Sequence, residues 1–175
     1  MNAILSRLDR ELASSLHGLD STQTQLRLID DPGHWSIHQM VQHLLLTYKS
    51  TASSFESRLA KGRPTLSRPT LNQRTTRFVV VTLGLMPGRR KAPPEVAPAW
   101  PETPLSGQEL ARAASEALAK LDLVFNKADK TFGSAPCQSH FVLGPLSASQ
   151  WRRFHLSHGR HHIRQILAIR RARGI

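Results

Sequence analysis

The stretch from residue 147 to residue 166, SASQWRRFHLSHGRHHIRQI, carries the clearest structural signal in this chain. Ser147 and Gln150 have the spacing of a capping box, in which each side chain bonds a free backbone N–H at the start of a helix. Apolar residues then recur at helical intervals to about Arg173 and Gly174. The stretch therefore predicts a long amphipathic helix, and this helix would hold four histidines.

Three of these histidines share the face that the apolar residues would bury: His155, His158 and His162. Arg160 and Arg164 point more towards solvent or a neighbouring helix, whereas a nucleic-acid-binding face would group the imidazoles with the arginines. We therefore expect inward-facing imidazoles, which leaves two interpretations. Either they stay neutral and bond backbone carbonyls or one another, or they bind a metal ion.

A buried imidazole nitrogen without a hydrogen-bond partner costs about 1–3 kcal/mol of stability. A metal ion would remove this cost by binding the nitrogen. His158 and His162 are four residues apart, the step that serves helical zinc sites. His155 and His162 would lie about 10 Å apart along the axis, too far for bonds near 2.1 Å to one ion. A third ligand must come from another helix. His43 is the best candidate because it flanks an apolar stripe; the alternative is a partly exposed histidine.

Three further stretches show helical periodicity, at about residues 2–16, 36–61 and 106–130. Residues 74–86 could form a short helix or a strand, because Val79-Val80-Val81-Thr82 has strong β character. Six prolines in residues 87–104 predict an extended loop, and residues 140–145 are expected to form a shorter loop. The chain, residues 1–175, thus predicts one all-α domain: a four-helix bundle with a long Pro-rich crossover loop between helices 2 and 3.

The charge is strongly positive, with 24 Lys and Arg against 12 Asp and Glu, or +12 with histidine neutral. Such a field attracts nucleic acid, anionic membranes or anionic small molecules, although an ordinary solvated basic surface is an equal alternative. The sequence holds no helix-turn-helix, zinc-finger spacing or aromatic RNA-binding motif. Nucleic-acid binding therefore has support from charge alone.

No segment approaches the roughly 20 apolar residues of a membrane span, so no membrane association is expected. The N-terminal stretch lacks the continuous apolar run of a secretory signal. The single cysteine, Cys137, cannot form an internal disulfide, which fits a reducing compartment. A cytoplasmic protein is the expectation.

Two short motifs carry a resemblance to a known family. Trp35-Ser36 followed by His43-Leu44, with His158-Gly-Arg-His-His-Ile-Arg-Gln165 in the last helix, resembles the DinB-like (YfiT-like) metal-binding four-helix bundles. The resemblance spans residues 35–166, and residues 144–151 are similar to a poorly characterised branch of that superfamily. It implies an up-down-down-up bundle, often a homodimer. It also implies that His43, His158 and His162 bind a divalent metal.

The resemblance also implies chemistry, because characterised members include thiol-dependent transferases and isomerases that use glutathione, mycothiol or bacillithiol. A site of three imidazoles leaves coordination positions open, so a zinc, nickel or iron ion could lower the pKa of a bound thiol or water. We therefore expect a metal-dependent, thiol-dependent transferase for a small molecule. A hydrolase at the same site is the nearest alternative, and a non-catalytic basic protein that binds nucleic acid or a protein partner is another.

Three further residues could contact the cofactor or substrate. Arg164 could bind the carboxylates of a small thiol, and Gln165 could hold a ligand histidine or the substrate. Tyr48, about one turn beyond His43, could donate a hydrogen bond into the pocket. Each has an ordinary alternative: a salt bridge for Arg164, helix packing for Gln165 and simple burial for Tyr48. The general acid or base is not identified by the sequence.

Overall fold

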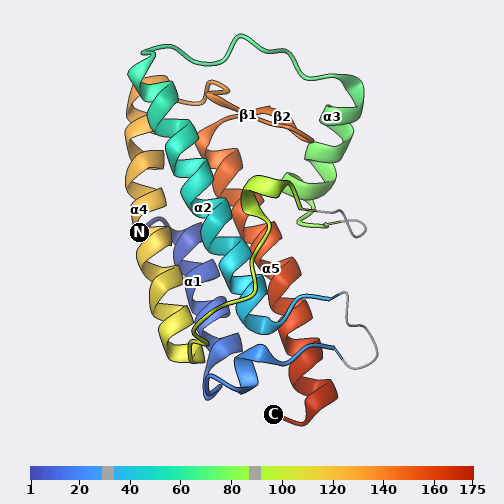
Figure 1. Ribbon diagram of the computed structural model, residues 1–175. Coiled ribbons are helices and arrows are strands. Elements are labelled where there is room, and N and C mark those ends of the chain that lie inside the picture. The colour runs from blue at the N-terminus through green and yellow to red at the C-terminus, as the bar shows by residue number, and fades with distance from the viewer. Residues whose placement is uncertain (29–33, 87–91) are drawn as a thin grey trace.

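The computed structural model describes residues 1–28, 34–86 and 92–175 (Figure 1). The first five residues of the expected Pro-rich loop, 87–91, therefore lie outside the described residues. The described chain is mostly helical, which confirms the expected all-α class in its coarse form. Within the described residues a small two-stranded sheet is added to the helices.

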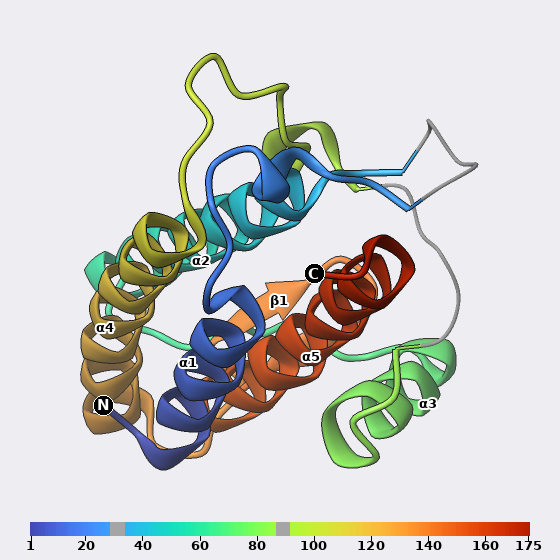
Figure 2. The same cartoon turned by 90° about the horizontal axis from the view of Figure 1, so that it is seen from below.

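Four long helices lie side by side and make most of the core: α1 (Ala3–Leu16), α2 (Ile37–Ala60), α4 (Gly107–Phe132) and α5 (Ala148–Arg173). In Figure 1, α1 and α5 run downwards while α2 and α4 run upwards. Figure 2 shows α1 between α4 and α5, with α2 packed along α4. The contact between α2 and α5 is less extensive, and this is where the candidate site opens.

Capping boxes fix where α2, α4 and α5 begin, because each N-cap serine and the residue three places later bond one another's backbone N–H groups. The pairs are Ser36–Gln39, Ser106–Glu109 and Ser147–Gln150. At the other end, Gly133 follows α4 and Gly174 follows α5, both with positive φ, which glycine adopts without steric cost. The predicted helix boundaries thus agree with the observed ones to within about two residues.

Helix α1 presents a row of buried leucines to the core: Leu5, Leu8, Leu12 and Leu16. Gly159 allows α5 to approach this row closely, because a Cβ atom there would lie 2.3 Å from Leu8 Cδ1. The Leu8 side chain therefore packs directly on the backbone of α5 at this point. This close packing holds the histidine-bearing face of α5 in a defined orientation.

The ambiguous segment 74–86 is helical at its start. It forms the end of α3 (Leu71–Arg77), followed by a π-helical turn from Phe78 to Thr82. Thr70 and Gln73 form a capping box that starts α3. Val80 and Val81 are buried, and the Ser157 hydroxyl of α5 donates a hydrogen bond to the Val80 carbonyl at 2.8 Å. Helix initiation and packing on α5 thus outweigh the β propensity of the valines.

Residues 140–145, expected to form a loop, are instead largely part of a hairpin made by β1 (Gln138–His140) and β2 (Gly144–Leu146). Gly144 has a φ of 72°, which favours glycine, and His140 Nδ1 accepts hydrogen bonds from the N–H groups of Val142 and Leu143. The turn is thus stabilised by a histidine side chain. The hairpin closes one end of the space between α2 and α5.

Two short 3₁₀ helices complete the described chain: η1 (Gln23–Gln25) and η3 (Pro94–Val96). The second lies in the described part of the Pro-rich segment, residues 92–104, which otherwise has no regular structure. It packs against α2. Over the described chain, no helix combines the length and apolar character needed to cross a bilayer.

Candidate metal centre

Three histidines from two helices meet at one point: His43 on α2 and His158 and His162 on α5. The Nε2 atom of His158 lies 3.2 Å from Nε2 of His43 and 3.1 Å from Nε2 of His162. His158 and His162 are neighbours because they are one turn apart on α5. His43 reaches them because α2 packs beside α5 with this turn facing it.

The spacing of these nitrogens fits a small divalent ion. Two nitrogens about 3.1–3.2 Å apart, each bonded at about 2.1 Å, subtend roughly 95–100° at the ion, between the octahedral and tetrahedral values. Three such donors leave coordination positions for a substrate. Because all donors are imidazoles, the set suits zinc, nickel or iron better than calcium or magnesium, which prefer oxygen.

The outer nitrogens show which tautomer two of these histidines adopt. His43 Nδ1 lies 2.7 Å from the Val96 carbonyl oxygen, and His162 Nδ1 lies 2.8 Å from Gln165 Oε1. Both oxygens can only accept, so each Nδ1 donates its proton and each neutral ring has a lone pair on Nε2. The lone pairs of His43 and His162 thus both point at His158, whose neutral ring has only one N–H to donate. At least one lone pair is therefore left without a hydrogen, and a bound cation would accept it.

Burial keeps these imidazoles uncharged. His43, His158 and His162 are 5%, 8% and 6% exposed. Loss of hydration lowers the pKa of all three, that of His162 to about 3, and for His158 and His162 the neighbouring imidazoles lower it further. The neutral form is the one that binds metal, so these ligands would need no deprotonation at neutral pH. Phe154 stacks on His158 with ring centroids 5.4 Å apart.

The other inward histidines lie outside this cluster. His155 is buried among aromatic rings, and neither of its ring nitrogens has a hydrogen-bond partner. His38, also on α2, uses Nδ1 to contact Gln25 Nε2 at 3.2 Å and the Leu105 N–H at 3.4 Å. His155 and His38 therefore belong to the packed interior. The pair four residues apart is the one that converges with His43.

A cavity of about 430 Å³ extends from the three histidines between α2 and α5 to the hairpin. We call it the slot. Trp35 lies at its metal end, with its ring 4.9 Å from the His43 ring and 6.2 Å from the His162 ring. His161 also lines this end. The volume is that of a pocket for a small organic molecule.

The three predicted cofactor-contacting residues lie at different depths. Gln165 contacts a ligand histidine, as described above. Arg164 is exposed on α5, and Tyr48 is buried with its hydroxyl unpaired and its ring against His155. Burial and the charge of Asp9 raise the Tyr48 pKa. None of the three lines the slot, and their roles towards a cofactor stay predictions.

Several residues of the site were not singled out from the sequence. Val96 contributes a backbone carbonyl, which no side-chain motif can reveal. Trp35 was quoted only as part of the family motif, and its ring packs against that of His43. The hydroxyl residues Thr47, Thr51 and Ser54 follow His43 at helical spacing and line the slot. That spacing was visible in the sequence and could have indicated a shared face.

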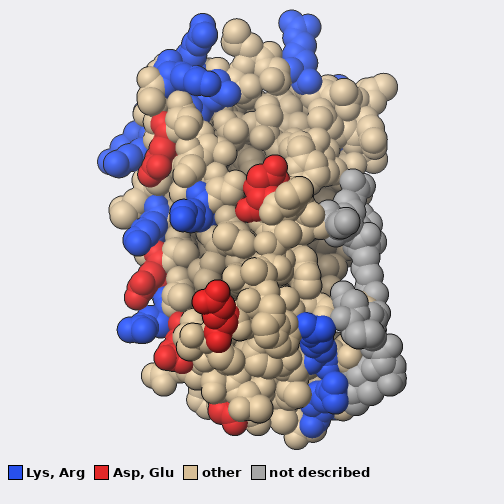
Figure 3. Space-filling view, in the orientation of Figure 1, with Lys and Arg blue, Asp and Glu red and all other residues tan. Residues whose placement is uncertain are grey.

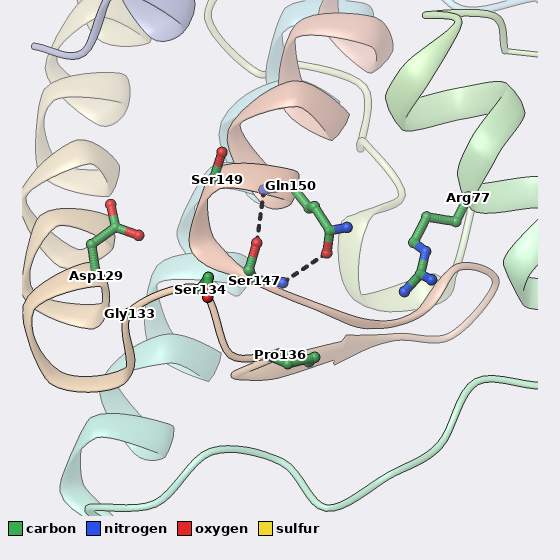
Figure 4. Close-up of a pocket in the computed structure, with 8 residues that line it drawn as sticks. All are labelled: Arg77, Asp129, Gly133, Ser134, Pro136, Ser147, Ser149 and Gln150. Carbon is green, nitrogen blue, oxygen red and sulfur yellow. Dashed lines mark hydrogen bonds between the residues drawn. The ribbon is translucent and has the colours of Figure 1, made fainter.

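A second, more open hollow of about 630 Å³ lies at the start of α5 (Figure 4). Its charged residues and its capping box already have partners. Ser147 and Gln150 form the capping box, Arg77 donates to the Pro145 carbonyl at 3.1 Å, and Asp129 accepts from Arg152 at 2.6 Å. The other two hydroxyls, of Ser134 and Ser149, are exposed to solvent and do not indicate a ligand. Cys137, nearby, is buried, and burial raises the pKa of its thiol to about 11, so it is a poor nucleophile.

Comparison with known proteins gives one match. A family model described as the DinB superfamily matches residues 4–166, which include all three histidines of the cluster. No curated protein and no solved structure matches this chain.

Proposed function

The chain belongs to the DinB superfamily, and from this premise we propose that it is a divalent-metal-dependent enzyme with His43, His158 and His162 as the metal ligands. One observation carries the proposal: three buried Nε2 atoms converge, and at least two present lone pairs because their Nδ1–H groups are already donated. A packed interior without a metal would gain nothing from this arrangement. The finer proposal is a thiol-dependent transferase that acts on a small molecule.

The metal would supply a thiolate, because a zinc, nickel or iron ion at an open position lowers the pKa of a bound thiol such as glutathione, mycothiol or bacillithiol. The chain's own residues do the positioning. Val96 and Gln165 hold two ligand rings by their outer nitrogens. Trp35 and Phe154 pack against the ligand rings and limit water there. The slot would hold the second substrate, and Arg164, outside it, would meet the carboxylates of a thiol that has them.

A metal-dependent hydrolase at the same centre is the second candidate. His161 favours it, because this residue lines the slot next to His162, with ring centroids 5.2 Å apart. Its imidazole could accept a proton from water during hydrolysis. A transferase needs no such group, since the metal itself activates the thiol. Activity with and without the small thiol separates the two candidates.

The proposal extends to the architecture and setting of the protein. The helix directions in Figure 1 support an up-down-down-up bundle, which we propose forms one domain over residues 1–175. A homodimer in the cytoplasm follows from the family resemblance and the single cysteine. The described part of the Pro-rich crossover supports the proposal by its contact with His43 through Val96.

Metal analysis of protein purified without a histidine tag tests the function. We expect close to one bound divalent ion per chain, lost in His43→Ala together with thiol-dependent transfer to an electrophile, while circular dichroism keeps its helical signal. Gln165→Leu should weaken metal binding by about 10- to 100-fold, because the His162 ring loses its acceptor. His17→Ala, at an exposed histidine, is the matched control and should keep metal and activity. Metal content unchanged in His43→Ala would overturn the proposal.

A further inference from the structure

The slot has two chemically different walls. On α2, residues Thr47, Ser50, Thr51 and Ser54 continue the helix face of His43, at four, seven, eight and eleven residues beyond it. At 1.5 Å per residue, this row of hydroxyls extends about 16 Å from the metal end. The facing wall is largely aromatic and aliphatic, with Trp151 and Phe154 of α5 and residues 141–143 of the hairpin turn. The polar residues of β1, Gln138, Ser139 and His140, also line it.

The hydroxyls beyond Thr47 have no hydrogen-bond partner among the described residues. Thr47 donates to the His43 carbonyl at 2.8 Å. Thr51 is only 5% exposed, yet its hydroxyl, like those of Ser50 and Ser54, makes no hydrogen bond with any described residue. The Thr51 hydroxyl is accessible to solvent rather than fully enclosed, so water or a ligand in the slot can form a hydrogen bond with it. The row is therefore available to a ligand in the slot.

The apolar wall offers a flat surface and few competing polar groups. The Trp151 indole N–H is already donated to the Gln138 carbonyl at 3.1 Å. Phe154 stacks on His158, so the aromatic surface is continuous with the metal end. Phe141 at the hairpin turn is 72% exposed, although it is aromatic and lines the slot. An exposed aromatic ring at the rim of a cavity is suited to contact with a ligand.

The charge of the slot differs from that of the whole chain. Although the chain has 24 Lys and Arg, none of them is among the described residues that line the slot. The carboxylate lining it is that of Glu95, which is exposed beside Val96. Figure 3 shows basic side chains mainly along the edges of one face, while acidic ones lie both near its centre and along its left edge. An anionic ligand would find no cationic partner on these described walls.

We propose that the slot binds an uncharged, elongated organic molecule, with an apolar face against Phe154 and the hairpin and a hydrogen-bonding edge along Thr51 and Ser54. This inference rests on the proposed function, because the molecule would be the second substrate at the metal centre. The slot would therefore disfavour molecules with a carboxylate, although the chain as a whole has a net charge of +12. Thr51 and Ser54 are binding residues and take no part in the chemical step.

A matched pair of probes tests the inference: N-acetyl-tyrosinamide, which is neutral, and N-acetyl-tyrosine, which differs by a carboxylate. Both are titrated into metal-free, ¹⁵N-labelled protein and followed by amide NMR shifts. We expect the amide to shift signals of residues 47–54 and the hairpin, and the acid to bind at least about 10-fold more weakly. Equal binding, tighter binding of the acid, or no shift in these residues would overturn the inference.

Variants test the hydroxyl row. Thr51→Val and Ser54→Ala should each weaken binding of the amide by about 2- to 10-fold, the effect of one lost hydrogen bond. Ser53→Ala is the matched control, since Ser53 is exposed on the same helix and does not line the slot. If Ser53→Ala weakens binding as much as the other two, the row has no role. These titrations use metal-free protein, so they do not depend on the metal analysis. If the protein binds no metal, the titrations still test the slot. If the slot binds no probe, the metal analysis still tests the proposed function.

Discussion

His155 is completely buried one turn before the three-histidine cluster, and both of its ring nitrogens lack a hydrogen-bond partner. Burial, with a smaller effect of His140, lowers its pKa to about 3. In the unfolded chain the same imidazole titrates near its ordinary value of about 6.5. Below about pH 6.5 the unfolded state therefore binds a proton that the folded state does not, and the free energy of unfolding falls as the pH falls towards 3.

Replacement of His155 by leucine, a residue of similar volume, should remove this pH dependence. We expect His155→Leu to reduce the loss of stability between pH 6.5 and 4 by up to about 1.4 kcal/mol per pH unit, the value for one proton. Urea unfolding at several pH values measures it. Phe55→Leu, in the same core but without a titratable group, should lower stability by a similar amount at every pH. A steeper slope in His155→Leu would contradict the expectation.

Residues on one helix were easier to predict as a site than residues from two. His158 and His162 are four residues apart, so helical geometry alone places them together. His43 had to be inferred, because its approach depends on how α2 packs on α5 and on Val96, fifty-three residues away. The sequence placed it at the flank of the apolar stripe, whereas the described structure buries it. The burial of His43 by a loop far away in the sequence cannot be recognised from the helical pattern of the residues around it.

The start of α4 meets the end of α1 at Gly107. A Cβ atom at Gly107 would lie 2.0 Å from the Leu16 carbonyl oxygen, which is backbone and cannot rotate away. The Gly107 N–H also donates to the Leu19 carbonyl at 2.9 Å. This contact joins the end of the first helix to the beginning of another across ninety residues of chain.

Gly107→Ala should therefore destabilise the protein, although alanine favours helices over glycine by about 1 kcal/mol. We expect a net loss of about 1–3 kcal/mol, since the helix must shift to relieve the overlap. Chemical denaturation measures this loss. Gln108→Ala, at the exposed next position, is the control and should change stability by less than about 0.5 kcal/mol. A stabilised Gly107→Ala would show that the two helix ends are not held this closely.

The three helices with serine capping boxes were predictable, whereas α3, despite its Thr70–Gln73 capping box, and the elements held by tertiary contacts were not. Ser36, Ser106 and Ser147 start their helices by bonds within four residues, so local sequence is sufficient. By contrast, the helical state of Val80 and Val81 depends on their packing against α5, and the hairpin depends on the His140 side chain. Local β propensity was misleading for the valines, and the turn at Gly144 looked like an ordinary loop.

The whole molecule carries a large positive charge with few ion pairs to offset it. Among the described residues the pairs are Arg7–Glu11, Arg160–Glu11, Arg152–Asp122 and Arg152–Asp129. Most of the remaining basic groups lie at the surface, and on the face in Figure 3 they line the edges. Like charges at this density repel one another and destabilise the compact state. Among the described residues, no Lys or Arg lines the slot.

Salt should therefore stabilise the protein. Raising NaCl from about 0.01 M to about 0.3 M shortens the Debye length from about 30 Å to below 10 Å, which screens the repulsion. We expect the melting temperature to rise by about 2–4 °C for each kcal/mol of repulsion removed. Lys127→Glu, at an exposed position, lowers the net charge from +12 to +10 and should reduce this response. A melting temperature that falls with added salt would show that attractive pairs dominate.

The capping boxes also limit where the chain length can change. His43 follows Ser36 by seven residues and His158 follows Ser147 by eleven, which is close to two and three full helical turns. Each histidine therefore lies on nearly the same side of its helix as the N-cap serine. One inserted or deleted residue between cap and ligand would turn the imidazole by about 100° away from the centre. Among relatives of this chain, gaps in an alignment should therefore avoid residues 36–43 and 147–162. The connection at residues 63–69, which bears no such angular constraint, should tolerate them.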